Sequence, residues 1–421
     1  MNKNKDYLIY AVLIVLSVIG SLIYFNQPLA DSDHYFDTTR FMQGKDAVID
    51  SPWASRMLVP LIAAALEPIF GMSITYSLLS ILFYCLSSIL AYVFFKDFFK
   101  NKHIGFISAI IFATSLPLIA WGGRPLIETA GFFFLFLGIA VIEWCLKKGR
   151  VIDYAVIGIV MALAILAKDH NYILPVYFIL SILFKDGFSF VKKANNENRT
   201  NPQIKVWDFC RAIFGIENCR TKVRGIKPTI FNKILKILAA FFISILPAYL
   251  WRKLLSLHIA SKYPNYINFF LQYQFNFSTI LWMFGFRTFI TFHILWIPFV
   301  FGLFSDKDKE RRGFYLKNFV IEFTAIIFIF VVVGLFSPRY AFMLFPFVIP
   351  LAAYGLYDGS RKLAKKLKLK NFYLIIVAFL IIYALLSYFG ASLYPEDASI
   401  LKEDLLQMVF KRFNQVYGWL F

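Results

Sequence analysis

A cluster of acidic residues follows the first long apolar run of the sequence. Within seven residues the chain has three carboxylates, Asp31, Asp33 and Asp37. His34 and Tyr35 lie between them. A charged side chain this close to hydrocarbon is costly and usually has a function, and a carboxylate at a membrane surface can act as a general base on an acceptor hydroxyl. A solvated acidic loop explains the same segment equally well, and a lone His beside such acids is more often a polar contact than a ligand.

Charged residues also occupy the other turns predicted on the same side of the membrane. They are Arg124 and Glu128, then Lys168, Asp169 and His170, and finally Arg339 with Tyr340. A single Arg or Lys at the membrane edge usually reaches toward lipid headgroups. Several of them on one face, together with the acidic segment, fit a site that holds phosphate and sugar. Arg donates two parallel hydrogen bonds to a phosphate, whereas Lys provides a point charge.

Membrane-spanning helices must position these turns, because the composition excludes an ordinary soluble domain. The 421 residues are 59% hydrophobic and only 16% charged, with a mean hydropathy of +0.65. Lipid offers the backbone no hydrogen bonds, so the long apolar runs must be helices. We predict an all-α polytopic membrane helix bundle of about eleven transmembrane helices. The predicted spans are residues 7–25, 72–95, 104–120, 126–146, 151–167, 173–184, 234–250, 280–304, 314–336, 341–358 and 371–392.

The distribution of basic residues predicts the orientation of this bundle. In a soluble protein the net charge of +19 would suggest a nucleic-acid partner. Here most of the Lys and Arg residues fall in alternate loops, as the positive-inside rule requires, so we expect a membrane protein without a nucleic-acid partner. The N-terminus is then cytoplasmic, residues 1–25 are a retained first span, and the acidic segment is extracytoplasmic. The bias toward Lys, Asn, Phe and Ile favours a prokaryotic plasma membrane.

Residues 1–421 form a single membrane domain in this interpretation, with three further segments. Residues 26–71 are the first outer loop, which includes an interfacial helix, and residues 185–233 are a basic cytoplasmic loop. Residues 393–421 have apolar positions at helical spacing and are predicted to form an amphipathic interfacial helix. In the eighth span, Arg287 and His293 interrupt an apolar stretch. Pairing inside the bundle and contact with a substrate phosphate explain Arg287 equally well.

The order of these motifs resembles the GT-C superfamily of membrane glycosyltransferases, which includes protein O-mannosyltransferases and aminoarabinose transferases. The resemblance is carried by an acidic first outer loop, a following helix with Arg and Pro, a Gly-Arg-Pro turn before an acid, a Lys turn and an Arg-Tyr pair. In this sequence these are Asp31 to Tyr35, Arg56 and Pro60, Gly123 to Pro125 with Glu128, Lys168 with Pro175, and Arg339 with Tyr340. The match is good over residues 1–185 and looser over 314–358.

The resemblance implies an inverting transfer of a single sugar from a polyprenyl-phosphate donor to a lipid, glycan or protein acceptor outside the cytoplasm. The essential first-loop acid of the family falls on Asp31 or Asp33. Asp31 fits the spacing to Tyr35 better and is the implied base, with Asp33 as its partner or as a contact to sugar or metal. Glu128 stands where many members keep a second acid. Some members use a divalent metal, Mg²⁺ or Mn²⁺, on an Asp-x-Asp motif and others do not, so no metal ligand is assigned.

The basic residues would hold the donor in such an enzyme. Lys168, Arg124 and Arg339 would bind the lipid phosphate and offset the charge that develops as it leaves. The other substrate-binding candidates are His34, Tyr35, Arg56, Asp169, His170, Arg287 and Tyr340. Two other classes compete with this interpretation: a transporter or flippase of lipid-linked glycans, and a polysaccharide polymerase or ligase. The crowding of charges on one face, rather than at the midplane, favours the transferase over a transporter.

Overall fold

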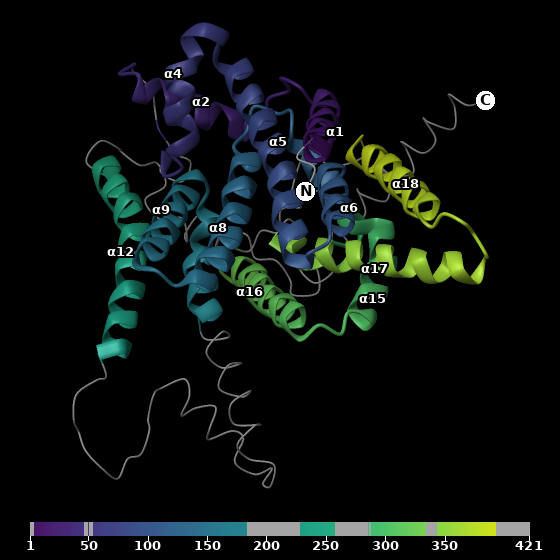
Figure 1. The fold of residues 1–421 in the computed structure, drawn as a ribbon. Coiled ribbons are helices and arrows are strands. Elements are labelled where there is room, and N and C mark those ends of the chain that lie inside the picture. The colour runs from purple at the N-terminus through teal and green to yellow at the C-terminus, as the bar shows by residue number, and fades with distance from the viewer. Residues whose placement is uncertain are drawn as a thin grey trace, which may run out of the picture.

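A computed structural model describes residues 4–45, 49, 54–182, 228–256, 285, 288–333 and 343–392 of the chain. Within these residues every regular element is a helix (Figure 1). Five stretches are long and apolar enough to cross a membrane: Met72–Phe99, Glu128–Lys148, Leu235–Leu254, Thr288–Ser305 and Tyr373–Ala391. Five shorter apolar helices accompany them. The all-helical membrane class is therefore confirmed, while the number of eleven spans stays a prediction.

The centre of the bundle is formed by α5 (Met72–Phe99), α6 (Lys102–Ala113) and α8 (Glu128–Lys148), which pack against one another. Phenylalanines from all three helices fill the space between them, as in the contact of Phe112 with Phe136 at 5.9 Å between ring centroids. Small hydroxyl residues join α1 (Asn4–Leu22) to this core, because Ser17 and Ser88 share a hydrogen bond of 2.9 Å. Buried hydroxyls of this kind hold neighbouring helices together within a membrane.

The predicted span 104–120 is wrong as a single helix. The chain forms α6 and then a separate short helix, α7 (Leu116–Trp121), with an extended residue, Ser115, between them. Pro117 lies in the first turn of α7. Proline has no N–H for a hydrogen bond to the preceding turn, and its ring restricts the residue before it, so the helix cannot continue through this point.

The helices α2, α4 and α12 lie away from this central group. Near the end of the bundle where α1 finishes are α2 (Ala30–Met42) and α4 (Leu58–Phe70), which pack on each other (Figure 1). We call this the α2 end. Far to one side is α12 (Pro228–Ser256), which packs along α9 (Val151–Ala167). It starts within the segment predicted as the cytoplasmic loop 185–233, most of which lies outside the described residues, as does the predicted helix 393–421.

Close helix packing joins α15 (Trp296–Ser305) to α17 (Phe345–Lys366). A Cβ atom on Gly302 would lie 2.0 Å from the carbonyl oxygen of Leu351, and one on Gly355 would lie 1.9 Å from that of Pro298. Both distances are far below any real contact. The two glycines therefore let the helix backbones touch directly, which is the usual role of small residues between membrane helices.

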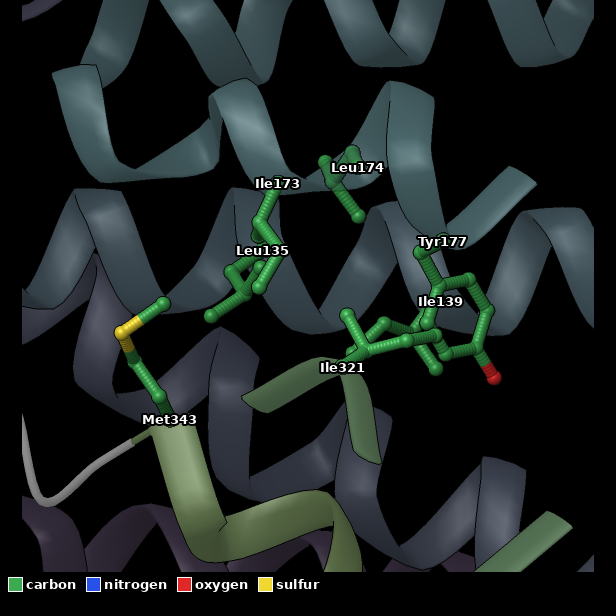
Figure 2. Close-up of a pocket in the computed structure, with 7 residues that line it drawn as sticks. All are labelled: Leu135, Ile139, Ile173, Leu174, Tyr177, Ile321 and Met343. Carbon is green, nitrogen blue, oxygen red and sulfur yellow. The ribbon is translucent and has the colours of Figure 1, made fainter. Parts of the chain in front are cut away.

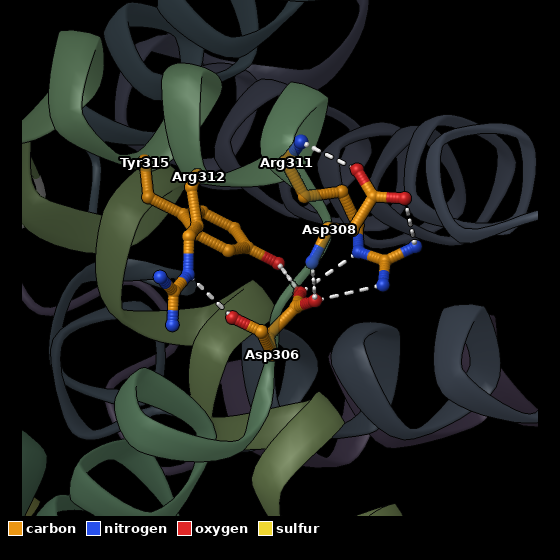
Figure 3. Close-up of polar contacts among 5 residues, drawn as sticks. All are labelled: Asp306, Asp308, Arg311, Arg312 and Tyr315. Atoms are coloured by element: carbon orange, nitrogen blue, oxygen red, sulfur yellow. Dashed lines mark hydrogen bonds and ion pairs between the residues drawn. The ribbon is translucent and has the colours of Figure 1, made fainter.

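The turn from α15 to α16 (Lys309–Val333) is fixed by one buried carboxylate (Figure 3). Asp306 is 1% exposed and accepts hydrogen bonds from Arg311 Nε at 2.8 Å, Arg311 Nη2 at 2.7 Å and the Tyr315 hydroxyl at 2.9 Å. Its backbone carbonyl accepts a further bond from Arg312 Nε at 2.6 Å. The pairing with Asp306 raises the pKa of the Arg311 guanidinium, which stays charged.

Other ion pairs tie helices together at the same end as this turn. Lys96 of α5 forms an ion pair with Asp6 of α1 at 2.7 Å. The hydrogen bonds that Lys96 and Tyr92 donate to the Asp6 carboxylate lower the pKa of that carboxyl group. Lys317 of α16 is buried and pairs with Glu143 of α8. These basic residues therefore form ion pairs that join neighbouring helices of the protein.

Candidate active site

The acidic segment is a helix and not a loop. Asp31 and Asp33 both lie in the first turn of α2, where the helix dipole favours negative charge. Residues two positions apart do not face each other on a helix. Asp31 is accordingly half-buried against the protein, whereas Asp33 is exposed. The Asp-x-Asp pair thus presents its two carboxylates in different directions, and only Asp31 belongs to the inward face.

Tyr35 anchors that inward face. It lies one helical turn after Asp31, is completely buried, and its hydroxyl accepts a hydrogen bond of 2.5 Å from Arg56 Nη1. The Tyr76 hydroxyl of α5 donates to the Tyr35 carbonyl at 3.0 Å and lies 2.7 Å from Thr39 Oγ1. The structure therefore brings together two predicted residues, Tyr35 and Arg56, and adds Tyr76 as a third. The half-buried His34 lies beside this group, and its carbonyl accepts from the Thr38 hydroxyl at 2.8 Å.

A second group joins α8 to the turn after α9. Lys168 ends α9 in an extended conformation, and its Nζ forms an ion pair with Glu128 Oε1 at the start of α8. Both side chains are buried, at 5% exposure for Lys168 and 0% for Glu128. The Lys168 stem lies over Gly131, where a Cβ atom would be 2.9 Å from Lys168 Cβ. Asn171 closes the turn by donating to the carbonyls of Gly131 and Ala164, at 3.1 and 2.8 Å.

The rest of this turn is the short helix η1 (Asp169–Tyr172). The His170 ring stacks on Phe132 of α8, with 5.9 Å between centroids. Asp169 belongs to η1, but its side chain is outside the described part of the chain. Arg252 of α12 lies 5.2 Å from the Tyr172 ring centre. The turn is therefore held between α8 and α12.

Arg124 forms a third group at the α2 end. It is 4% exposed, its Nε donates to the Ala120 carbonyl at 2.9 Å, and its guanidinium carbon lies 4.2 Å from the centre of the Tyr24 ring. The Tyr24 hydroxyl donates to the Ala391 carbonyl of α18 (Tyr373–Ser392) at 2.7 Å. Arg124 thus links the end of α1, the turn before α8 and the end of α18.

Three predicted residues, Arg287, Arg339 and Tyr340, lie outside the described residues. His293, which was noted beside Arg287, is described: it lies in η3 (His293–Leu295), its Nε2 shares a hydrogen bond of 2.9 Å with Ser387, and its ring is 4.6 Å from that of Tyr383. These contacts join η3 to α18 and explain His293 as a structural residue of the bundle.

The described residues offer no obvious metal site, since no three His, Cys, Asp or Glu side chains among them could hold an ion together. Between α8, residues 173–182, α16 and Met343, which lies just before α17, there is a small pocket (Figure 2). Its lining is apolar apart from the Tyr177 hydroxyl: Leu135, Ile139, Ile173, Leu174, Tyr177, Ile321 and Met343. Such a lining cannot bind phosphate or sugar. None of the described residues predicted for the site lines this pocket.

Comparisons with known proteins agree with this assignment of the fold. Residues 52–194, which include Arg56, Arg124, Glu128 and Lys168, match the profile of the dolichyl-phosphate-mannose-protein mannosyltransferase family. No curated protein matches the sequence. The matched segment carries most of the residues that form the second and third groups described above.

Solved membrane enzymes share the arrangement of helices. The apo oligosaccharyltransferase of Archaeoglobus fulgidus is 13% identical, with a TM-score of 0.55 over 93% of this chain and 56% of that chain. The same enzyme in complex with an inhibitory peptide and a dolichol-phosphate gives a TM-score of 0.52 at 13% identity, over 93% and 56% of the two chains. Apo ArnT of Cupriavidus metallidurans also gives 0.52 at 13% identity, over 92% of this chain and 76% of that one. The chain spans little more than half the length of the oligosaccharyltransferase. At such identities the likeness shows the fold.

Proposed function

We propose that this chain, which has the fold of the GT-C membrane glycosyltransferases, transfers a single sugar from a polyprenyl-phosphate donor to an acceptor at the α2 end. The chain is an integral membrane protein, and the side carrying the α2 end is extracytoplasmic by the positive-inside rule. The matched family is described by its dolichyl-phosphate-mannose donor, and one similar structure holds a dolichol-phosphate. Both support a lipid-linked donor here.

The observation that carries the proposal is the fixed position of the inward face of α2. Asp31 shares that face with Tyr35, whose side chain and carbonyl are held by Arg56 and Tyr76. A general base must be held near the proton that it removes, and a short helix bonded to its neighbours provides this. Asp33 is exposed on another face and is better placed to contact solvent or acceptor. We therefore assign the base to Asp31.

In the proposed reaction the acceptor hydroxyl attacks the anomeric carbon of the sugar. Asp31 takes the hydroxyl proton, the bond from that carbon to the phosphate oxygen breaks, and the configuration inverts. The polyprenyl phosphate leaves with an additional negative charge. Basic side chains that are already oriented lower the barrier, because they stabilise this charge as it develops.

Among the basic groups, we assign Lys168 to the leaving phosphate. The side chains of Lys168 and Glu128 are both buried, and their ion pair fixes the position of Lys168 Nζ. Glu128 then positions Lys168, a role different from the second catalytic acid implied by the resemblance. Arg124 would contact the phosphate from the side of α1. Arg339 lies outside the described residues, and its contact with the lipid phosphate stays a prediction. We include no step through a metal, because the described residues do not supply a ligand set.

The test is transfer of radiolabelled sugar from polyprenyl-phosphate donors in membranes that contain equal amounts of each variant. Asp31→Asn keeps the size of the side chain but cannot accept the proton, so we expect transfer to fall by about 100-fold or more. Asp37→Asn is the matched control on the same helix, because Asp37 pairs only with the exposed Arg40 in the described structure, and we expect a change within about twofold.

Undiminished transfer by Asp31→Asn would contradict its role as the base, and equal losses in Asp31→Asn and Asp33→Asn would contradict the choice between them. Wild type that transfers none of the sugars tested, across lipid, glycan and peptide acceptors, would contradict the enzyme assignment itself. That last result would favour a transporter of lipid-linked glycans.

A further inference from the structure

The turn between α17 and α18 carries a concentration of positive charge that the protein does not use internally. We call residues 361–370 the basic elbow. Its cations are Arg361, Lys362, Lys365, Lys366, Lys368 and Lys370. All six are exposed, and within the described residues only Lys362 has an acidic partner, Asp358 at 2.7 Å. Some basic residues elsewhere at this end are paired, as in Lys96 with Asp6 and Arg311 with Asp306.

Exposed leucines alternate with these cations. Leu363, Leu367 and Leu369 are 44%, 56% and 45% exposed. A free surface in water would gain nothing from such residues. Leucines beside lysines suit the boundary between headgroups and acyl chains, where leucine enters the apolar region and the lysine ammonium reaches the phosphates.

The shape of the elbow is fixed by the end of α17. The Leu369 N–H donates to the Ala364 carbonyl at 2.9 Å and the Lys368 N–H to the Lys365 carbonyl at 3.4 Å, with Lys368 at a φ of 53°. This is the Schellman arrangement, and its left-handed residue is usually glycine. A lysine there adds a sixth cation to the elbow in a conformation that L side chains rarely adopt.

Aromatic rings mark the level of the membrane surface beside the elbow. Tyr373 opens α18, and its ring lies 4.2 Å from Phe372 and 5.4 Å from His103 of α6, between centroids. The His103 ring also stacks with Tyr357 of α17. Aromatic residues of this kind gather where a bilayer meets water. The elbow directly precedes α18, a helix long and apolar enough to span a membrane (Figure 1). We therefore expect the elbow to lie at headgroup height.

We infer that the basic elbow binds the headgroups of anionic phospholipids in the cytoplasmic leaflet. Four to eight Lys and Arg residues immediately next to a spanning helix bind such lipids, because the leaflet carries a negative surface potential. The partner is a lipid rather than a free phosphate, since the exposed leucines require an apolar phase beside the charge. This inference is independent of the proposed transferase activity.

The experiment measures which lipids the full chain retains. The detergent-solubilised protein is equilibrated with equal amounts of phosphatidylglycerol and phosphatidylcholine with matched acyl chains, and repurified. Bound lipid is then quantified by mass spectrometry. We expect wild type to retain about fivefold more phosphatidylglycerol, the preference that one basic side chain at an anionic surface provides. Added NaCl should reduce this ratio, whereas glycerol phosphate at the same concentration as the lipid should not compete.

Two variants with the same change of charge separate the effect of the elbow on lipid binding from the effect of the protein's net charge. In K365Q/K366Q/K368Q/K370Q the ratio should fall toward one. In K147Q/K148Q/K307Q/K309Q, which removes four exposed lysines elsewhere on the same side, it should remain near the wild-type value. A ratio near one in wild type, an unchanged ratio in the elbow variant, or equal losses in both variants would each overturn the inference.

Lys368→Gly separates a loss of lipid binding from a loss of folding, because the two are expected to change in different directions. Glycine accepts a positive φ without strain, so its thermal midpoint should equal or exceed that of wild type. The phosphatidylglycerol ratio should nevertheless fall, because one cation is lost. A midpoint and a ratio that both stay at the wild-type values would contradict a role for this lysine in lipid binding.

Discussion

Single residues set the geometry of the candidate site, and Gly131 is the sharpest case. Its missing Cβ leaves room for the stem of Lys168, which lies 2.9, 3.2 and 3.3 Å from where a Cβ would be, at Cβ, Cγ and Cδ. Gly131→Ala should displace the Lys168 ammonium without changing any charge. A displacement of about 1 Å can lower the rate up to about 100-fold, so we expect sugar transfer to fall at least tenfold.

The matched control for this change is Gly359→Ala on α17. A Cβ there would meet only the Phe301 ring, at an ordinary contact of 3.4 Å. Its transfer rate should stay near that of wild type when both are measured at equal protein level. Wild-type transfer by Gly131→Ala would show that the position of Lys168 does not matter for the reaction.

Tyr76 is the second residue whose role can be tested alone. Its hydroxyl is shared by Thr39 and the Tyr35 carbonyl, and all three groups are buried. Tyr76→Phe leaves these partners without the hydroxyl, which should cost about 1–3 kcal/mol of stability. The measurement is the thermal midpoint of the purified protein. Tyr7→Phe is the control, because Tyr7 is 66% exposed; an equal effect of the two changes would argue against the anchoring of α2.

Charged residues of the site could be named from the sequence, but their partners could not. Lys168 and Glu128 could be named because charge close to hydrocarbon is costly, yet nothing in their separation of 40 positions indicates that they pair. Tyr76 and Asn171 were missed altogether, because a single polar residue within or beside an apolar run has no distinguishing pattern. The only signal for Asn171 was its place in the charged turn after Lys168.

At the scale of elements, the buried Asp306 makes one turn of the chain rigid. It binds Arg311 twice and Tyr315 once, so its removal leaves a partly buried guanidinium without its principal partner. We expect Asp306→Ala to destabilise the protein by about 3–5 kcal/mol, measured as a loss of thermal stability in detergent.

Asp308→Ala is the comparison for this prediction. Asp308 is 43% exposed, lies 3.5 Å from Arg311 Nη1 and accepts the Arg311 backbone N–H at 3.0 Å, so its removal should cost only about 1–2 kcal/mol. The prediction fails if the two alanine variants lose the same stability, since burial would then not distinguish the two aspartates.

Helices are predictable from the sequence where a long apolar run must cross the lipid. They are less predictable where contacts with the rest of the protein determine the helix limits. The apolar runs of α5, α8 and α18 gave helices within a few residues of the predicted limits. The run 104–120 was predicted as one helix because its hydropathy is continuous, and the effect of Pro117 was overlooked. The helix α2 was predicted as a loop because its residues are polar, although Tyr35, Thr38 and Thr39 form a buried face at helical spacing.

At the scale of the whole molecule, the orientation in the membrane is the prediction on which the site depends. Single cysteines at Asp33 and Lys366, in a background with the four native cysteines replaced by serine, should react from opposite sides. We expect a membrane-impermeant maleimide to label Asp33→Cys in intact cells and Lys366→Cys only after permeabilisation. The reverse order would place the α2 end on the wrong side for an extracytoplasmic donor. Labelling of both positions in intact cells would instead contradict the cytoplasmic position of the basic elbow.

The direct backbone contact of α15 with α17 has a consequence for how the chain is made. Helices enter the membrane in order during synthesis, and α16 lies between these two in the sequence. After insertion α15 must therefore wait in lipid until α17 follows, because the surface on which Gly302 docks does not yet exist. In a chain synthesised only as far as residue 333, α15 lacks this partner. At that stage the incomplete protein would be open to proteolysis. Substitutions at Gly302 or Gly355 would then lower the amount of protein in the membrane long before any effect on its chemistry could be seen.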